Sequence, residues 1–166
     1  RMTGMPQMVG LLNGFGGAAS ALVASAELMR AVKSGAAPDR GSTAAIAASI
    51  FIGWITFTGS AMAFAKLQGL VTSRPIVLPL QKTLNAALAL ACVALSAWLA
   101  LRPDAAPAFW VLSALSLALG VTLVNPIGGA DMPVVISLLN SYSGMAACAT
   151  GFALGNSSLI ITGALV

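Results

Sequence analysis

Long apolar runs separated by single charged residues are the dominant pattern of this sequence. Five runs carry no charge, at positions 2–26, 41–65, 83–101, 105–130 and 132–166. The first four are 19 to 26 residues long, and about 20 apolar residues cross a bilayer core as an α-helix. The last run has 35 residues and is divided by a turn cluster at Gly155–Ser158. The pattern predicts an all-α, polytopic transmembrane bundle.

Five complete helices and the start of a sixth are expected, in one transmembrane domain over residues 1–166. Their predicted ranges are about 6–30, 43–67, 82–101, 107–124, 132–154 and 157–166, the last of them truncated. A transmembrane β-barrel is excluded, because it would show short alternating strands. Since the sixth segment reaches Val166 after only ten residues, at 157–166, we expect more chain to follow it.

Composition narrows the class of protein further. Only 12 of the 166 residues are charged, which is 7%, whereas a soluble domain carries about 25%. The net charge of +4 comes from single charges beside apolar runs and does not indicate a nucleic-acid-binding surface. A soluble globular domain, a disordered chain and a nucleic-acid binder are therefore excluded. The chain contains no histidine, so no imidazole can exchange protons here near neutral pH.

Motifs for cofactor chemistry are not convincing in this chain. Residues 14–19 match the dinucleotide pattern G-x-G-x-x-A, but that pattern requires a preceding strand, and here it lies within a predicted membrane helix. Cys92 and Cys148 lie in apolar runs, where we expect buried thiols and no metal pair. We predict no catalytic, cofactor-binding or metal site in this chain.

Asp131 is the one acidic residue beside a helix start that does not belong to a charged loop. It precedes Met132-Pro133, and Asp at the N-cap with Pro in the first turn is a favoured helix start. One interpretation is that Asp131 only caps the helix. The alternative is that it also acts at the membrane surface.

Polar residues in the interior of the fifth predicted helix are the second candidates. Ser137, Asn140 and Ser141 share one helix face at spacings of three and four residues, and Asn13 is the corresponding group on the first helix. One interpretation is close helix packing, which small residues and Asn promote in membranes. The alternative is a narrow, water-filled path for protons, and we favour packing slightly. A transporter or proton path is favoured over an intramembrane hydrolase.

Four stretches extend this interpretation. They are GGADMPVVISLLNSYSGMAACATGFALGNSSLIITGALV at Gly128–Val166, MPQMVGLLNGFGG at Met5–Gly17, FIGWITFTGSAMAFAKLQG at Phe51–Gly69 and SRPIVLPLQKTLN at Ser73–Asn85. In this order they resemble the membrane domain of the β subunit of proton-translocating NAD(P) transhydrogenase. The resemblance implies an enzyme that couples hydride transfer between NAD(H) and NADP(H) to proton movement, with both nucleotides held by other domains.

The resemblance also implies roles for the candidate residues. Asp131 aligns with an Asp that faces the NADP(H)-binding domain, and Asn140 aligns with an Asn of the proton path, flanked by Ser137 and Ser141. Asn13 aligns with a position where many members carry His. Because Asn cannot titrate, either a partner subunit supplies the protonatable group, which we favour, or water alone bridges to Asp131.

The implied partners are the membrane helices of the α subunit, the NADP(H)-binding domain of the same parent chain and the NAD(H)-binding subunit. A homodimer of complete units in the bacterial plasma membrane, or in the mitochondrial inner membrane, is expected. Two rival hypotheses are a stand-alone permease or channel component and a scaffold that only packs helices.

Overall fold

A computed structural model describes residues 4–35, 39–77, 79–103 and 105–166 of the chain. The elements are α1 (Gly4–Ser34), α2 (Arg40–Leu67), α3 (Gln81–Leu101), α4 (Ala106–Val124), η1 (Gly129–Asp131), α5 (Met132–Leu154) and α6 (Ser157–Leu165). Five of these helices are long and apolar enough to cross a membrane, and no strand occurs in the described ranges. The predicted all-α transmembrane fold, five complete helices and a short sixth, is confirmed.

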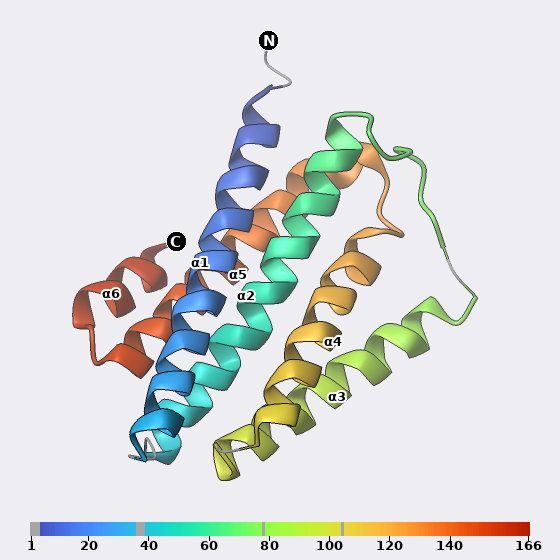
Figure 1. Ribbon diagram of the computed structural model, residues 1–166. Coiled ribbons are helices and arrows are strands. Elements are labelled where there is room, and N and C mark those ends of the chain that lie inside the picture. The colour runs from blue at the N-terminus through green and yellow to red at the C-terminus, as the bar shows by residue number, and fades with distance from the viewer. Residues whose placement is uncertain (1–3, 36–38, 78, 104) are drawn as a thin grey trace.

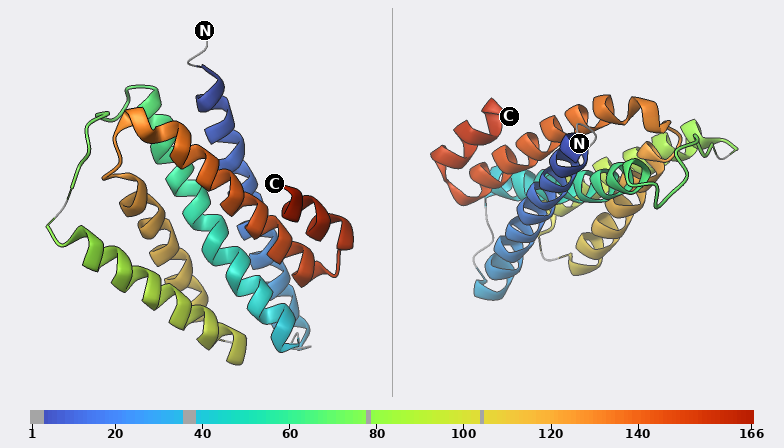
Figure 2. Two further views of the ribbon diagram at one scale, coloured as in Figure 1. Left: turned by 180° about the vertical axis from the view of Figure 1, so that it is seen from behind. Right: turned by 90° about the horizontal axis from the view of Figure 1, so that it is seen from above.

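The helices run alternately up and down, so the connections gather at two ends (Figure 1). The α2–α3 loop and η1 lie together at one end, which we call the Asp131 end. The α1–α2, α3–α4 and α5–α6 connections lie at the opposite end (Figures 1 and 2). Helix α2 is central, because it packs against α1, α3, α4 and α5.

Helices α1 and α2 approach so closely that their backbones touch. A Cβ atom added to Gly17 would lie 2.7 Å from the carbonyl oxygen of Gly53, and one added to Gly53 would lie 2.6 Å from the carbonyl oxygen of Gly17. Small residues allow this approach, which is the usual basis of helix association in lipid. Small residues and Asn13 recur on this α1 face at spacings of three and four positions: Gly10, Asn13, Gly14, Gly17, Ala21 and Ala24 are all buried.

Two apolar clusters fill the interior, one towards each end. The cluster at the opposite end joins α1, α2, α3 and α4 around Ile50, Cys92 and Leu112. The cluster at the Asp131 end joins α2, α4 and α5 around Ala63 and Met132. The second cluster fixes the start of α5 against α2, and so it positions the turn that carries Asp131.

A tight hairpin returns α6 along α5 (Figure 2). Gly155 adopts a left-handed backbone with φ 63°, which glycine tolerates without strain, and the Asn156 side chain accepts from Leu159 N–H at 3.1 Å. Gly144 and Gly163 then bring the two helices together, since a Cβ on Gly144 would lie 2.7 Å from the Gly163 carbonyl oxygen. Part of the small-residue face predicted on α5 therefore serves helix packing.

The observed helix ends differ from the predicted ones by at most four residues. Helix α1 continues from the predicted end at Arg30 to Ser34, and α2 begins at Arg40, three residues before the predicted start. Asp39 explains the early start of α2, because its carboxylate accepts from Gly41 N–H at 2.9 Å and from Ser42 N–H at 3.2 Å. These bonds satisfy backbone donors that a helix start leaves unpaired.

We expect Asp39→Ala to lower the thermal stability of the full-length protein slightly at neutral pH and not at all in strong acid. Hydrogen bonds from the Ser42 hydroxyl and then its backbone N–H hold the pKa of Asp39 below its usual value of 3.8. A carboxylate with a lowered pKa stabilises the fold above its unfolded pKa, and that stabilisation is lost as the pH falls through the folded pKa. Unfolding midpoints of the two proteins should therefore differ at pH 7 and converge as the pH falls through the lowered pKa of Asp39. A constant difference at all pH values would contradict this role.

Candidate functional site

A groove between the first halves of α1 and α5 brings together two of the predicted site residues. It has a volume of about 400 Å³. Its walls are mainly apolar, and Ser137 and Asn140 contribute polar side chains; the lining residues are Met5, Pro6, Val9, Pro133, Ile136, Ser137 and Asn140. Because Met5 and Val9 are exposed, the groove opens on the outside of the described bundle and towards the Asp131 end.

Asn13 lies beside this groove but is engaged with backbone. It is buried, and its Nδ2 donates to the carbonyl oxygen of Ile136 at 3.1 Å. In an α-helix that carbonyl is also the acceptor of the Asn140 backbone N–H, four residues on. Asn13 therefore joins α1 to α5 at the turn below Asn140, as expected for an Asn that bridges membrane helices.

Asn140 is half-buried and keeps a polar environment around it. Its side-chain Nδ2 lies 3.5 Å from the carbonyl oxygen of Val166, at the end of α6. Its backbone carbonyl oxygen accepts from Ser143 Oγ at 2.8 Å. Ser141 is exposed on the same α5 face, but it does not line the groove. The structure thus brings Asn13, Ser137 and Asn140 together and leaves Ser141 outside.

Asp131 lies at the start of α5 but does not cap it with its side chain, so the predicted capping role is wrong. It ends the short turn η1 with φ −91° and ψ 0°, and its carboxylate makes no capping hydrogen bond. An N-cap residue needs an extended backbone to fold its side chain over the first helical N–H groups, whereas Asp131 has a helix-like backbone. The exposed carboxylate is therefore available at the surface.

Asp131 and Asn140 do not contact each other directly. They are nine positions apart in the sequence, which corresponds to about 13 Å along α5 at 1.5 Å per residue. The groove spans part of this interval, because Pro133 lines its outer end and Asn140 its inner end. Ser137 and Asn140 form a short polar strip on α5, inside a groove that opens towards the Asp131 end of the bundle.

Lys66 is a polar residue of this region that sequence reasoning missed. It looked like a flanking charge, yet only 1% of its surface is exposed. Its Nζ donates to the carbonyl oxygens of Asn125 and Ile127, the latter at 2.8 Å. Nothing in the local sequence distinguishes it from Lys33 and Lys82, which are both exposed.

A second missed polar group crosses the middle of the bundle. Ser49 Oγ and Thr150 Oγ1 lie 2.6 Å apart, and Ser49 Oγ also donates to the carbonyl oxygens of Ser20 and Ala146. These bonds tie α1, α2 and α5 into one seam. Close contact of the α1 and α2 backbones at Gly17 and Gly53 adds to the packing of this seam.

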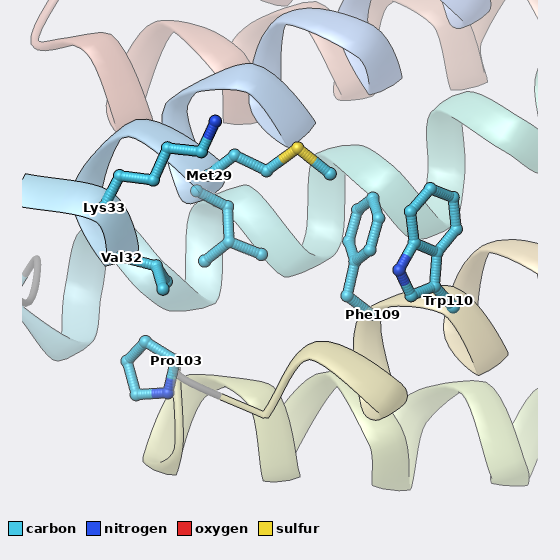
Figure 3. A pocket seen from close by; sticks show the side chains of 7 residues that line it. Met29, Val32, Lys33, Pro103, Phe109 and Trp110 are labelled. Atoms are coloured by element: carbon cyan, nitrogen blue, oxygen red, sulfur yellow. The ribbon is translucent and has the colours of Figure 1, made fainter.

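An apolar pocket of about 140 Å³ lies at the opposite end, between α1 and the start of α4 (Figure 3). Met29 and Val32 form one wall, and Phe109 and Trp110 form the other, with their rings edge to face at 4.9 Å. Lys33 is the only ionisable residue in its lining. The pocket therefore offers no acid–base pair and, apart from Lys33 and the indole N–H of Trp110, no polar side chain, whereas the groove between α1 and α5 has the side chains of Ser137 and Asn140 to hold water.

Metal chemistry has no site among the described residues, since no group of three or more His, Cys, Asp or Glu comes together there. The dinucleotide-like residues 14–19 lie inside α1, where Gly14 and Gly17 are buried against α2. That placement contradicts a phosphate-binding turn, which needs exposed backbone N–H groups between a strand and a helix.

Comparison with known proteins agrees with this membrane-embedded arrangement. Over residues 1–166 the sequence matches the family described as NAD(P) transhydrogenase beta subunit. It is 46% identical over 169 residues to the NAD(P) transhydrogenase subunit beta of Rhodospirillum rubrum. The aligned region covers 99% of this chain and 36% of the relative. The subunit of the same name from a defined strain of that species matches to the same extent. The chain thus spans little more than a third of the length of these curated relatives.

Proposed function

The chain belongs to the NAD(P) transhydrogenase beta subunit family, as its sequence motifs predicted, and on that premise we propose that it is the proton-conducting membrane segment of this enzyme. Hydride transfer between NAD(H) and NADP(H) takes place elsewhere in the holoenzyme. The observation that carries the proposal is the groove between α1 and α5, which is lined by Ser137 and Asn140 and opens near Asp131.

Asn140 and Ser137 are the groups that order water in the groove. An amide and a hydroxyl each donate and accept hydrogen bonds, so they can hold a short chain of water without titrating. Ser141 continues the same α5 face one turn further from Ser137. Asn13 keeps α5 in register with α1 through the Ile136 carbonyl oxygen.

The protonatable group comes from a partner in this proposal. The sequence contains no histidine, and the groove lining contains no ionisable side chain. The groove is open on the outside of the described bundle, where membrane helices of the α subunit would complete its wall. A His or carboxylate on such a helix, within hydrogen-bond reach of Asn140, would supply the proton site.

Asp131 is the contact between the membrane segment and the NADP(H)-binding domain of the same parent chain. Its carboxylate is exposed at the end of the bundle towards which the groove opens, although Asp131 does not line the groove itself. A change of protonation in the groove would then alter nucleotide affinity, and linkage requires the reverse effect to be equal for binding. The NAD(H)-binding subunit completes the unit, and two units form a dimer in the bacterial plasma membrane or in the mitochondrial inner membrane. Five helices that are long and apolar enough to cross a membrane support the membrane location.

Packing of partner helices without proton conduction is the second candidate, and one observation favours it. Touching backbones at Gly17–Gly53 and at Gly144–Gly163 are typical of helices selected for close association. This scaffold function and the stand-alone permease both predict that Asn140 is dispensable for coupling to nucleotide chemistry.

The test uses the complete enzyme, with the full-length parent chain and its partner subunits, in sealed vesicles. Reduction of an NAD analogue by NADPH is followed together with the pH of the lumen. We expect a pH change that an uncoupler abolishes, and a several-fold smaller pH change per turnover in Asn140→Ala. Leu138→Ala, on the exposed side of α5, is the matched control. Turnover without any pH change in the unsubstituted enzyme would refute proton conduction.

A further inference from the structure

Lys66 is a buried cation that the proposed mechanism does not use. It lies in the last turn of α2 at the Asp131 end, and 1% of its surface is exposed. Within the described parts of the chain the one ion pair joins Arg30 to Glu27, so no carboxylate there neutralises Lys66. A charged side chain in such a position is costly in a membrane protein and usually functional.

The acceptors of the Lys66 ammonium both belong to the connection between α4 and α5. Asn125 is the C-cap residue of α4, and Ile127 follows it two residues later; both carbonyl oxygens accept from Nζ. The last carbonyls of a helix lack intrahelical partners and carry the negative end of the helix dipole. Lys66 therefore fastens the end of α4 to the end of α2.

Further bonds extend this fastening to the α2–α3 loop. Ser73 Oγ donates to the Lys66 carbonyl oxygen at 3.3 Å, and the Ser73 carbonyl accepts from Gly129 N–H at 2.8 Å. A Cβ on Gly129 would lie 2.9 Å from Ser73 Cβ, so the loop and η1 are in close contact. Lys66 is thus bound to the turn through its side chain directly and through its backbone by way of Ser73.

The turn held in this way leads immediately to Asp131. Only three residues separate Ile127 from Asp131, and the next residue, Met132, is fully buried against the α2–α4–α5 cluster. The exposed Asp131 carboxylate is therefore presented by a short segment that is anchored on both sides. Lys66 provides the polar anchor, and Met132 provides the apolar one.

We infer that Lys66 is a positioning residue, whose ammonium group holds the α4–α5 turn so that displacement of α2 displaces Asp131. The inference rests on the proposed function, because it assigns Lys66 to the coupling that ends at Asp131. A cation that only caps α4 would affect how much enzyme assembles. A positioning residue affects how much proton movement accompanies each turnover of the assembled enzyme.

The test compares Lys66→Met with Lys66→Arg in the complete enzyme, in sealed vesicles normalised to assembled complex. In Lys66→Met we expect the pH change per turnover to fall about fivefold or more, the lower limit of typical coupling between sites, while turnover with an uncoupler present is retained. Lys66→Arg keeps the cation and should keep the pH change. Lys82→Met removes an exposed lysine just beyond the same loop and should resemble the unsubstituted enzyme.

Equal pH change per turnover in Lys66→Met and the unsubstituted enzyme would overturn the inference, and so would a parallel loss of coupled and uncoupled turnover. If Lys66→Met does not assemble, Lys66→Gln decides the matter, because its amide can donate to one carbonyl but is too short to hold both. Full coupling in Lys66→Gln would overturn the inference. Absence of a pH change in the unsubstituted enzyme would instead refute the proposed function.

Discussion

Gly17→Ala is expected to destabilise the membrane segment by about 1–3 kcal/mol, the usual cost of forcing an extra methyl group into a packed interior. The new Cβ would lie 2.7 Å from both the Gly53 carbonyl oxygen and Thr56 Cβ. The first of these atoms is backbone of α2, so it cannot turn aside as a flexible side chain would. Helices α1 and α2 must therefore move apart. The movement of α1 would also strain the hydrogen bond from Asn13 to the Ile136 carbonyl oxygen of α5.

Gly16→Ala is the matched control, one residue earlier in the same helix. Its Cβ would lie 3.8 Å from Ser143 Cβ, an ordinary contact distance, and both substitutions gain the same helix propensity, about 0.5–1 kcal/mol. The thermal unfolding midpoint of the purified full-length complex and its amount in membranes measure the effect. If the two variants unfold alike, the α1–α2 contact is looser than described.

Asp131→Asn is expected to abolish most of the coupling between nucleotide binding and proton movement without loss of stability. The carboxylate is exposed and makes no capping bond, so replacing it with an amide of the same shape should change stability by less than about 0.5 kcal/mol. The charge that we propose faces the NADP(H)-binding domain is lost, and the pH change per turnover should fall about fivefold or more.

Asp39→Asn serves as the control for Asp131→Asn at the opposite end of the bundle. Asp39 is also exposed, and Asn caps helices as well as Asp does. Both variants are compared in sealed vesicles by turnover, lumen pH and unfolding midpoint. Retention of the full pH change in Asp131→Asn would remove Asp131 from the coupling, whereas loss of stability would give it a structural role.

The helices could be predicted because the spacing of charges reflects the thickness of the bilayer. The ends of α1 and α2 were less accurate, because they depend on polar contacts outside the apolar runs. The α1 end carries an Arg30–Glu27 pair at 3.5 Å, and the α2 start depends on the cap at Asp39. Both features lie in residues that resemble an ordinary loop.

The candidate site was predictable to the extent that one helix determines it. Ser137 and Asn140 share a face of α5 because of their spacing, and the groove follows that face. The contact of Asn13 with the Ile136 carbonyl oxygen depends on the register between two helices, which local sequence does not encode. Lys66 was missed for the same reason, since the backbone carbonyls that accept from it lie 59 and 61 positions further along the sequence.

Helix α3 has a consequence for how the segment enters the membrane. It is the most apolar of the five spans and also the least buried, whereas α1 and α5 are the least apolar. A strongly apolar helix is stable in lipid by itself, while Gly, Ser and Asn lower the free energy gained on insertion. Helix α3 can therefore leave the translocation machinery unaided. Helices α1 and α5 gain less from lipid alone and both pack against α2, so we expect contact with α2 to stabilise them in the membrane during biosynthesis.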